Sequence, residues 1–241
     1  EEGWSLKHLL RRVISSRTYQ QRSRISPELL ERDPTNRLLA RGPRFRAEAE
    51  TVRDIALGVS GLLIPEFGGP PIVPSEEALP PEEDDHRRRS LYLFRKRNLP
   101  DPLLSSFDAP SGSTACARRV RTNTPLAALA ALNDPIFVEA SRALALRILR
   151  EGGKSDADRT DYAFRLCTGR PAKAAERTAL LALLEQHHKR LADGYLSINA
   201  VATGDPERVP DVPPGATLRD AAAWTVAARV LLNLDETLSK N

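Results

Sequence analysis

The stretch from Arg87 to Pro135 constrains the fold most, because the chain changes character there and has helical patterns on both sides. Residues 90–94 combine strand-forming residues with apolar side chains on both faces, which is typical of a short buried strand. Residues 117–122 are the candidate partner strand. Thr124-Pro125 and Asp134-Pro135 each pair a capping side chain with a proline suited to the first helical position. The stretch therefore predicts a small β ribbon followed at once by helices.

The core must be built mainly from Leu, Ala and Val, because aromatic residues make up only 5% of the chain. This composition favours helix packing over a β-sandwich. Apolar residues recur at helical spacing, or follow helix-start signals, in most of the chain. The segments that we expect to be helical are 4–16, 33–39, 45–61, 102–107, 124–133, 134–148, 157–168, 173–193 and 217–241. The sequence therefore predicts a mainly α fold with a small central β hairpin or ribbon and long proline-rich loops.

We expect residues 1–241 to form a single domain that is a fragment of a larger protein. The chain opens with EEGWSLKHLL, which has neither a Met nor an apolar signal segment. Six prolines and an acidic run interrupt regular structure between residues 65 and 86. The predicted layout is a helical first half (1–64), a proline-rich acidic loop (65–86), a small β hub (87–123), a helical second half (124–193), a loop (194–216) and a C-terminal helix (217–241).

The overall charge and the cysteines exclude several classes of protein. The net charge is +4 with a pI near 9.3, and the acids nearly balance the bases, which argues against a nucleic-acid partner. No apolar run is long enough to predict a transmembrane segment. Cys116 and Cys167 lie far apart, and the Cys and His spacing supports neither a zinc site nor covalent haem. We therefore expect no metal and no cofactor in this segment, while a Cys116–Cys167 disulfide stays open.

Several short motifs follow one another along nearly the whole chain. They are W-S-L-K-H-L-L at 4–10, S-R-T-Y-Q-Q at 16–21, D-P-T-N-R-L-L at 33–39, A-E-A-E-T-V-R-D at 47–54, V-S-G at 59–61, G-G-P at 68–70, R-R-S-L-Y at 88–92, F-D-A-P at 107–110, C-A-R-R at 116–119, T-N-T-P-L at 122–126, L-N-D-P at 132–135 and V-L-L-N-L-D-E-T at 230–237. Together they resemble the planctomycete-type C-terminal domain of unknown function, domain-of-unknown-function family 1553, which is found in planctomycete cytochrome-linked multidomain proteins. The chain departs from the family pattern at Ala127, where Gln is usual, and at Lys173, where a Ser or Thr cap is usual.

The resemblance implies a setting rather than a reaction. It implies an exported protein, periplasmic or on the cell surface, with haem c elsewhere in the full-length protein. The implied partners are the other domains of the parent protein, and an acidic polysaccharide is a further candidate. The family provides no catalytic residues that could be carried over to this chain.

The arginines of the stretch 87–135 are the main candidate site. The candidate anion-binding residues are Arg89, Arg95, Arg97, Arg118, Arg119 and Arg121, with Arg87 and Arg88 beside them. Converging guanidinium groups suit a sulfate, phosphate or uronate. The alternative is that these arginines are solvated or pair internally with Glu48, Glu50, Asp54 and Asp108. The same carboxylates could include an acid–base pair for glycoside cleavage, although the sequence does not fix their separation.

Other candidate residues have simpler interpretations as structural groups. His187 and His188 are adjacent and would point to different sides of a helix, which is poor geometry for chelation. Tyr92, Trp4 and Trp224, together with Phe94, could stack on sugar rings but are more simply packing residues. Cys116 lies near Arg118 and Arg119, yet no His or Asp at a recognisable spacing completes a nucleophile set.

Three functions remain compatible with the sequence. The first is a non-catalytic interaction or scaffold module at the C-terminal end of an exported, cytochrome-linked protein. The second is a hydrolase or lyase acting on acidic or sulfated polysaccharide through the arginines. The third is a docking surface for a c-type haem domain, whose association a basic face would accelerate in a salt-dependent way.

Overall fold

The computed structural model describes residues 3–72 and 85–240, and the mainly α class is confirmed in them. Residues 73–84, which hold most of the predicted proline-rich acidic loop, lie outside the described residues. The elements are α1 (Leu6–Ile14), α2 (Pro27–Arg32), β1 (Phe45–Arg46), α3 (Ala49–Ser60), the 3-10 turns η1 (Asp85–Arg87) and η2 (Ser90–Tyr92), α4 (Pro102–Ser106), α5 (Pro125–Asn133), α6 (Pro135–Glu151), α7 (Asp156–Thr168), α8 (Ala174–Ala192), α9 (Ile198–Thr203), α10 (Leu218–Leu232) and β2 (Ser239–Lys240).

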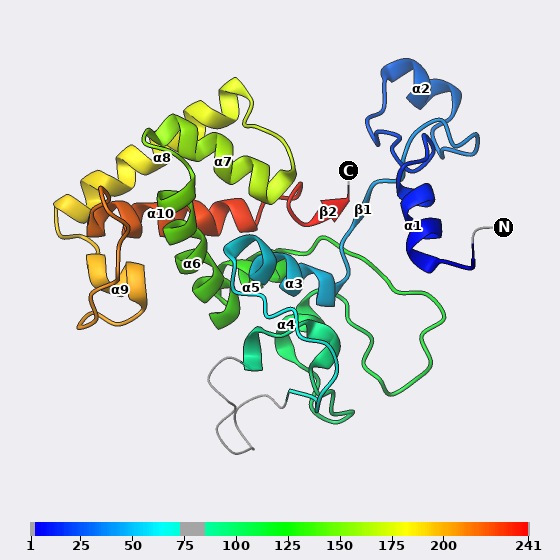
Figure 1. The fold of residues 1–241 in the computed structure, drawn as a ribbon, viewed down its shortest axis with the longest axis horizontal. Helices are drawn as coiled ribbons and strands as arrows, with labels where there is room; N and C mark the ends of the chain where they lie inside the picture. Colours follow the sequence, from blue (N-terminus) through cyan, green and yellow to red (C-terminus); the bar gives the residue numbers. More distant parts are fainter. Residues whose placement is uncertain (1–2, 73–84, 241) are drawn as a thin grey trace. The chain divides into compact units, whose positions relative to one another are not determined.

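The chain divides into two compact units (Figure 1). Unit 1 comprises Glu1–Arg46 and Ser239–Asn241, and unit 2 comprises Ala47–Leu238. The single domain expected from the sequence stays a prediction. No helix in the part of the chain that the structure describes is long and apolar enough to cross a membrane.

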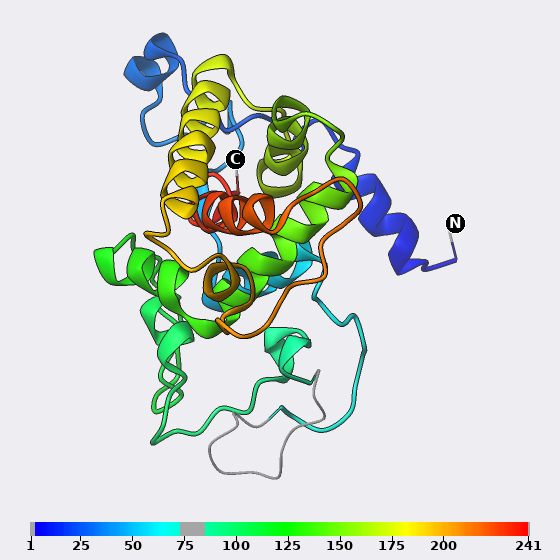
Figure 2. The same cartoon turned by 90° about the vertical axis from the view of Figure 1, so that its left-hand side faces the viewer.

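The core of unit 2 is organised around α10. This helix packs against α6, α8 and α9, as Figure 2 shows, and α6 also packs against α3. A row of buried alanines on α10, including Ala223 and Ala227, lets these helices approach closely, while Trp224 fills the space between them. The indole Nε1 of Trp224 donates to Asp156 Oδ1 at 3.3 Å, so the polar edge of the ring is satisfied. Trp224 is therefore a core residue, as its simpler interpretation predicted.

Three predicted helix starts of unit 2 are confirmed, at Thr124, Asp134 and Thr217. Thr124 and Asp134 accept hydrogen bonds from the backbone N–H groups of Ala127 and Ile136, with Pro125 and Pro135 at the following positions. Thr217 and Asp220 form the predicted capping box of α10. Gly169 ends α7 in the left-handed conformation, with φ of 76°. These signals are local hydrogen-bond geometry, and for that reason the sequence alone predicts them well.

The strand predicted at 90–94 is wrong. The backbone N–H of Tyr92 donates to the carbonyl of Arg89 in a 3-10 turn. Residues 90–94 make one parallel bridge within the described chain, between Ile72 and Leu93, in which Ile72 N donates to Tyr92 O at 2.7 Å. Leu91 is 79% exposed, so the apolar run is not a buried strand. The expected partner, residues 117–122, is not a strand either. The described chain instead forms its two-stranded antiparallel sheet between β1 and β2, which pairs Phe45 with Lys240 and Arg46 with Ser239.

Several smaller predictions also need correction. The helix expected at 45–61 begins only at Ala49, after β1, and the helix expected at 217–241 ends at Leu232, before β2. The helix expected at 33–39 is a series of turns, because the Asp33 carboxylate accepts the N–H groups of Arg37 and Leu38, both at 2.8 Å, and Asn36 and Leu39 adopt positive φ. The helix in this region is α2, which begins earlier, at a proline capped by Ser26. The loop expected at 194–216 contains the short helix α9.

Unit 1 is held together mainly by polar contacts. The guanidinium of Arg41 donates to the carbonyls of Asp33 and Pro34, at 3.0 and 2.8 Å, and so closes the turn that Asp33 opens. The ammonium of Lys240 lies 4.6 Å from the centre of the Tyr19 ring, which ties β2 to the segment after α1. Among the described residues of unit 1, Asp33 is the only buried one.

Candidate functional site

The first part of the candidate site is a group of ion pairs at the N-terminal end of α3. Arg119 donates to Glu48 at 3.1 Å and to Glu50 at 2.6 and 3.2 Å. Arg121 donates to Glu48 at 2.7 Å, and Arg95 lies 3.5 Å from Glu50. We call these five residues the α3 ion-pair group. It brings together Arg95, Arg119 and Arg121 of the predicted anion site, but their guanidinium groups face protein carboxylates.

The electrostatics of this group favour its charged form. Burial alone would raise the pKa of Glu50, but the hydrogen bonds and charge of Arg119 outweigh it and hold the pKa below its ordinary value. The same hydrogen bond to Glu50 raises the pKa of Arg119. The carboxylates also lie at a helix N-terminus, where the helix dipole favours negative charge. The acid–base pair needed for glycoside cleavage requires one protonated carboxyl, and the lowered pKa of Glu50 disfavours that form.

The second part is the buried side chain of Arg53, one turn further along α3. Its guanidinium donates to the carbonyl of Arg88 at 2.9 Å, to Ser90 Oγ at 3.2 Å and to the carbonyl of His86. The neighbouring carboxylate of Asp54 accepts from the backbone N–H of Ser90 at 2.8 Å and from its hydroxyl at 2.7 Å. Burial lowers the pKa of Arg53. Arg53 and Asp54 thus fix the path of residues 86–90 in the absence of a β-sheet.

The third part is Arg88, which is also buried. It donates to the carbonyls of Gly68 and Pro70, the latter at 3.1 Å, and its guanidinium lies 4.5 Å from the centre of the Tyr92 ring. The hydroxyl of Tyr92 accepts from Gly68 N at 2.8 Å. A Cβ at Gly69, which has φ of 86°, would lie 3.4 Å from the Arg88 guanidinium. The G-G-P motif and the R-R-S-L-Y motif are therefore two halves of one packing arrangement.

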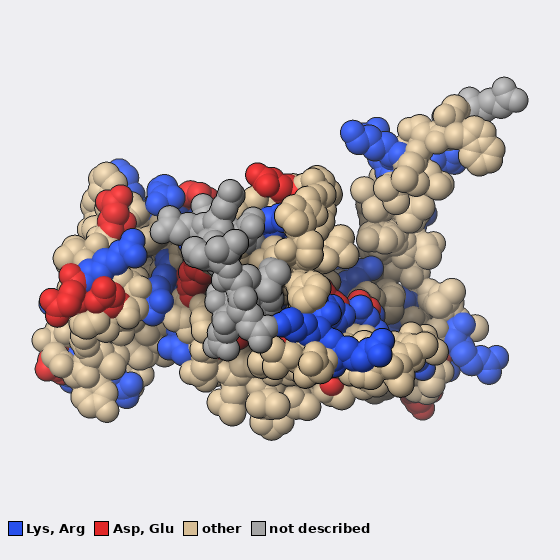
Figure 3. All heavy atoms as spheres, turned by 90° about the horizontal axis from the view of Figure 1, so that it is seen from below, with Lys and Arg blue, Asp and Glu red and all other residues tan. Residues whose placement is uncertain are grey.

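The remaining predicted residues lie elsewhere. Arg89, Arg97 and Arg118 are exposed, and none of the described hydrogen bonds or ion pairs joins them to the α3 ion-pair group. Asp108 accepts from the backbone N–H and hydroxyl of Thr122, at 2.6 and 2.8 Å. Of the predicted acids, only Glu48 and Glu50 have arginines of the predicted set as hydrogen-bond or ion-pair partners among the described contacts. On the face drawn in Figure 3, basic side chains gather in places with acidic ones beside them.

One of the comparisons with known proteins gives a family match. The model of the family PSD1, described as proteins of unknown function (DUF1553), matches residues 1–184. The chain belongs to the DUF1553 family. No curated protein and no solved structure matches it.

Several further arginines in this DUF1553 chain donate to backbone carbonyls of distant segments. These pairs are Arg95 with Pro110, Arg142 with Val201, Arg147 with Val59 and Arg229 with Leu132. A carbonyl at a helix end or in a loop has no partner within its own element, and a guanidinium can satisfy two such groups at once. Arginine side chains thus satisfy carbonyls in the last turns of α3, α5 and α9 and one carbonyl in a loop.

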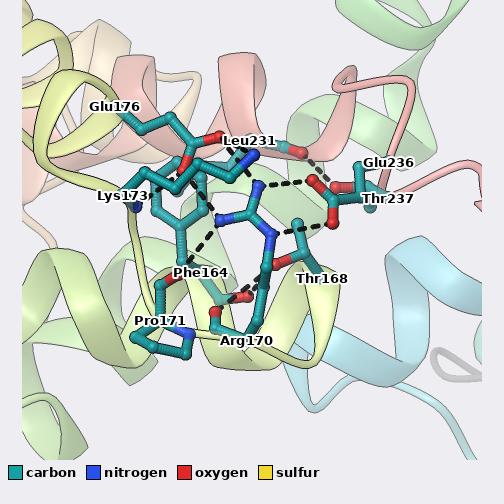
Figure 4. A network of polar contacts seen from close by, with 9 residues as sticks. All are labelled: Phe164, Thr168, Arg170, Pro171, Lys173, Glu176, Leu231, Glu236 and Thr237. Carbon is teal, nitrogen blue, oxygen red and sulfur yellow. Dashed lines mark hydrogen bonds and ion pairs between the residues drawn. The ribbon is translucent and has the colours of Figure 1, made fainter. Parts of the chain in front are cut away.

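The most extensive polar contacts surround Arg170, in the turn between α7 and α8 (Figure 4). Its guanidinium contacts Glu176 at 2.7 and 2.8 Å, Glu236 at 2.5 and 2.8 Å, and the carbonyl of Pro171 at 3.0 Å. The Phe164 ring lies beneath it, with its centre 5.8 Å away. No sequence pattern points to Arg170, because Glu236 is 66 positions away and only the fold brings it near. Arg170 links the start of α8 to the segment after α10.

The histidines and cysteines in the described part of the DUF1553 chain form no group that could hold a metal. No group of three or more His, Cys, Asp or Glu residues among these residues could hold a metal ion. His188 lies 3.6 Å from Asp220, and burial lowers the pKa of His187. Cys116 is exposed and Cys167 is buried, and both are free thiols, so they do not pair. Burial raises the pKa of Cys167 to about 12, which makes it a poor nucleophile at neutral pH.

Proposed function

We propose that this DUF1553 chain is a non-catalytic interaction or scaffold module of an exported, cytochrome-linked protein. The observation that supports the proposal most directly is the placement of the arginines. Arg53 and Arg88 are buried on backbone carbonyls, and Arg119 faces Glu48 and Glu50. A binding site for an anionic sugar needs guanidinium groups that a ligand can reach, and these groups already have protein partners.

The proposed setting is supported by the motifs shared with the planctomycete-type domain. Within it, the chain contacts other domains of the parent protein, and haem c belongs to another part of that protein. A haem stain and a periplasmic fractionation of cells producing the full-length protein test this setting. Recovery of the full-length protein in the cytoplasm, without covalent haem, contradicts it.

A turnover and binding screen tests the absence of catalysis. The chain is incubated with neutral, acidic and sulfated polysaccharides at two salt concentrations, and reducing ends, unsaturated products and bound glycan are measured. The proposal predicts no turnover, and only weak binding that salt removes. Turnover of any of these substrates would instead support the hydrolase or lyase alternative.

A double variant makes the screen specific to the predicted anion site. Arg118→Ala with Arg119→Ala removes one exposed and one ion-paired guanidinium from the same segment. The proposal predicts that this variant and the unmodified chain bind sulfated glycans equally. A loss of specific, salt-resistant binding in the variant would overturn it.

A further inference from the structure

Unit 1 has no hydrophobic core of its own. The structure describes its residues 3–46 and 239–240, and Asp33 is the only buried residue among them. The apolar side chains of α1 are exposed instead, from 45% for Val13 to 67% for Leu6. A chain segment that buries no apolar side chain cannot offset the entropy lost on folding. This exposure therefore points to a surface that a partner covers.

Helix α1 strengthens the argument, because it is short and strongly amphipathic. Its apolar residues Leu6, Leu9, Leu10, Val13 and Ile14 follow helical spacing, and Lys7 and Arg11 lie outside their stripe. Ser5 caps the helix by accepting from His8 N at 3.3 Å. A helix of nine residues is marginal in water without tertiary packing, even with a good cap.

The charge of unit 1 indicates the chemistry of the partner. Unit 1 contains twelve Lys and Arg residues and five Asp and Glu residues, which gives it a net charge of +7. Unit 2 has 24 Lys and Arg against 27 Asp and Glu, a net charge of −3. From Gly3 to Pro27 the chain has no acidic residue and has the basic residues Lys7, Arg11, Arg12, Arg17, Arg22 and Arg24. The apolar stripe of α1 is thus set in the most basic part of the chain.

We infer that the apolar face of α1 is a docking site for an amphipathic helix with acidic residues beside its apolar stripe. The inference rests on the proposed interaction function and names the class of its partner. A helix buries the leucines of α1 in its own apolar stripe, and its flanking Glu or Asp side chains face Lys7 and Arg11.

The other occupants fit these observations less well. A second copy of this chain would bring two units of net charge +7 together. Nucleic acid would match the charge, but its phosphate backbone has no apolar surface for five aliphatic side chains. An anionic membrane matches both properties, yet membrane binding scales with the apolar area inserted, and the five aliphatic side chains of α1 offer only a small area.

The test titrates the full chain onto two fluorescein-labelled synthetic helices and follows fluorescence anisotropy. Both peptides contain three heptads with Leu at the two core positions, and one has Glu and the other Lys at the flanking positions. We expect the Glu peptide to bind at least tenfold more tightly than the Lys peptide. We expect Leu10→Ser with Val13→Ser to weaken the binding of the Glu peptide at least tenfold. The matched control Leu38→Ser, at a 78% exposed site of unit 1 outside α1, should leave it unchanged.

A charge-reversal variant adds a second readout. Lys7→Glu with Arg11→Glu keeps the apolar stripe and should shift the preference from the Glu peptide to the Lys peptide. Equal binding of the two peptides by the unmodified chain would overturn the inference. So would binding that Leu10→Ser with Val13→Ser does not weaken.

Two further outcomes would also overturn the inference and identify another occupant. Binding to phosphatidylglycerol vesicles without binding to either peptide would assign the face to a membrane surface. A large drop in the chain's own unfolding midpoint in the Leu10→Ser, Val13→Ser variant, without peptide, would show that the face is covered within the chain. Neither outcome alters the result expected in the polysaccharide screen. Turnover in that screen would overturn the proposed function, but it would leave the expected peptide binding unchanged.

Discussion

Replacing Arg170 with Lys should destabilise the fold in a way that depends on pH. Lysine keeps the positive charge but is a point charge, so it cannot form the paired hydrogen bonds that Arg170 makes with Glu176 and Glu236. The hydrogen bonds from Arg170 hold the pKa of Glu176 down at about 2, against an ordinary value of 4.5. A shift of that size corresponds to about 3 kcal/mol of stability. The Glu176 side chain is 29% exposed, so solvent screens part of its interaction with Arg170. We therefore expect Arg170→Lys to lower the unfolding free energy by about 1–2 kcal/mol at pH 7.

The sign of the pH dependence follows from the direction of the shift. A carboxyl whose pKa is lower in the folded state stabilises the fold above its ordinary pKa, and this stabilisation is lost as the pH falls from 4.5 towards 2. The difference in unfolding free energy between the unmodified chain and Arg170→Lys should therefore be constant from pH 5 to 8. It should shrink by about half or more at pH 3.

Urea unfolding followed by circular dichroism at these pH values measures the difference. Arg150→Lys, an exposed arginine in the last turn of α6, is the matched control and should change stability by less than about 0.5 kcal/mol. A loss for Arg170→Lys no larger than that of the control would refute the structural role of Arg170. An equal loss at pH 3 and pH 7 would refute the assignment to Glu176.

Three further outcomes are expected. Arg53→Met should lower the unfolding free energy by about 3 kcal/mol, because it leaves the carbonyls of His86 and Arg88 without their donor, whereas exposed Arg89→Met should have little effect in the same urea assay. In the native chain at pH 8, Ellman's reagent should modify Cys116 rapidly and Cys167 at least a hundredfold more slowly; comparable rates would mean that Cys167 is not shielded. Lys173→Thr should increase the unfolding free energy by about 0.5–1 kcal/mol, because the N-cap of α8 makes no side-chain cap hydrogen bond. The midpoint of thermal unfolding should therefore rise slightly, and a lowered midpoint would contradict this interpretation of the cap.

The candidate site could be predicted only in part. The sequence predicted Arg119 and Arg121 as anion-binding candidates and Glu48 as a possible ion-pair partner. It did not distinguish a ligand site from internal ion pairs. That choice depends on which groups face each other across about 70 positions, which no local pattern encodes. Arg170 and Arg53 were missed for the same reason, because their partners are backbone carbonyls or acids far along the chain.

The errors in the predicted secondary structure have a related cause. The apolar run at 90–94 has strand-forming residues, but a strand also needs a neighbouring strand, and here the backbone of Ser90 is bound by the side chain of Asp54. Asp33-Pro34 has the residues of a helix start, yet the Asp33 carboxylate accepts N–H groups four and five positions later and closes a turn instead. In both places a side-chain oxygen competed with regular backbone hydrogen bonding.

The sequence by itself determined the class of the fold and the positions at which most helices of unit 2 begin. These features can be predicted without a structure because their signals act within a few residues of one another. The signals are the helical spacing of Leu and Ala and the capping residues Thr124, Asp134 and Thr217. Only the tertiary structure decided the roles of the arginines and the exposure of α1. Both depend on distant groups, since a guanidinium binds whatever acceptor the fold brings within reach, and an apolar face is a core or a docking surface according to what covers it.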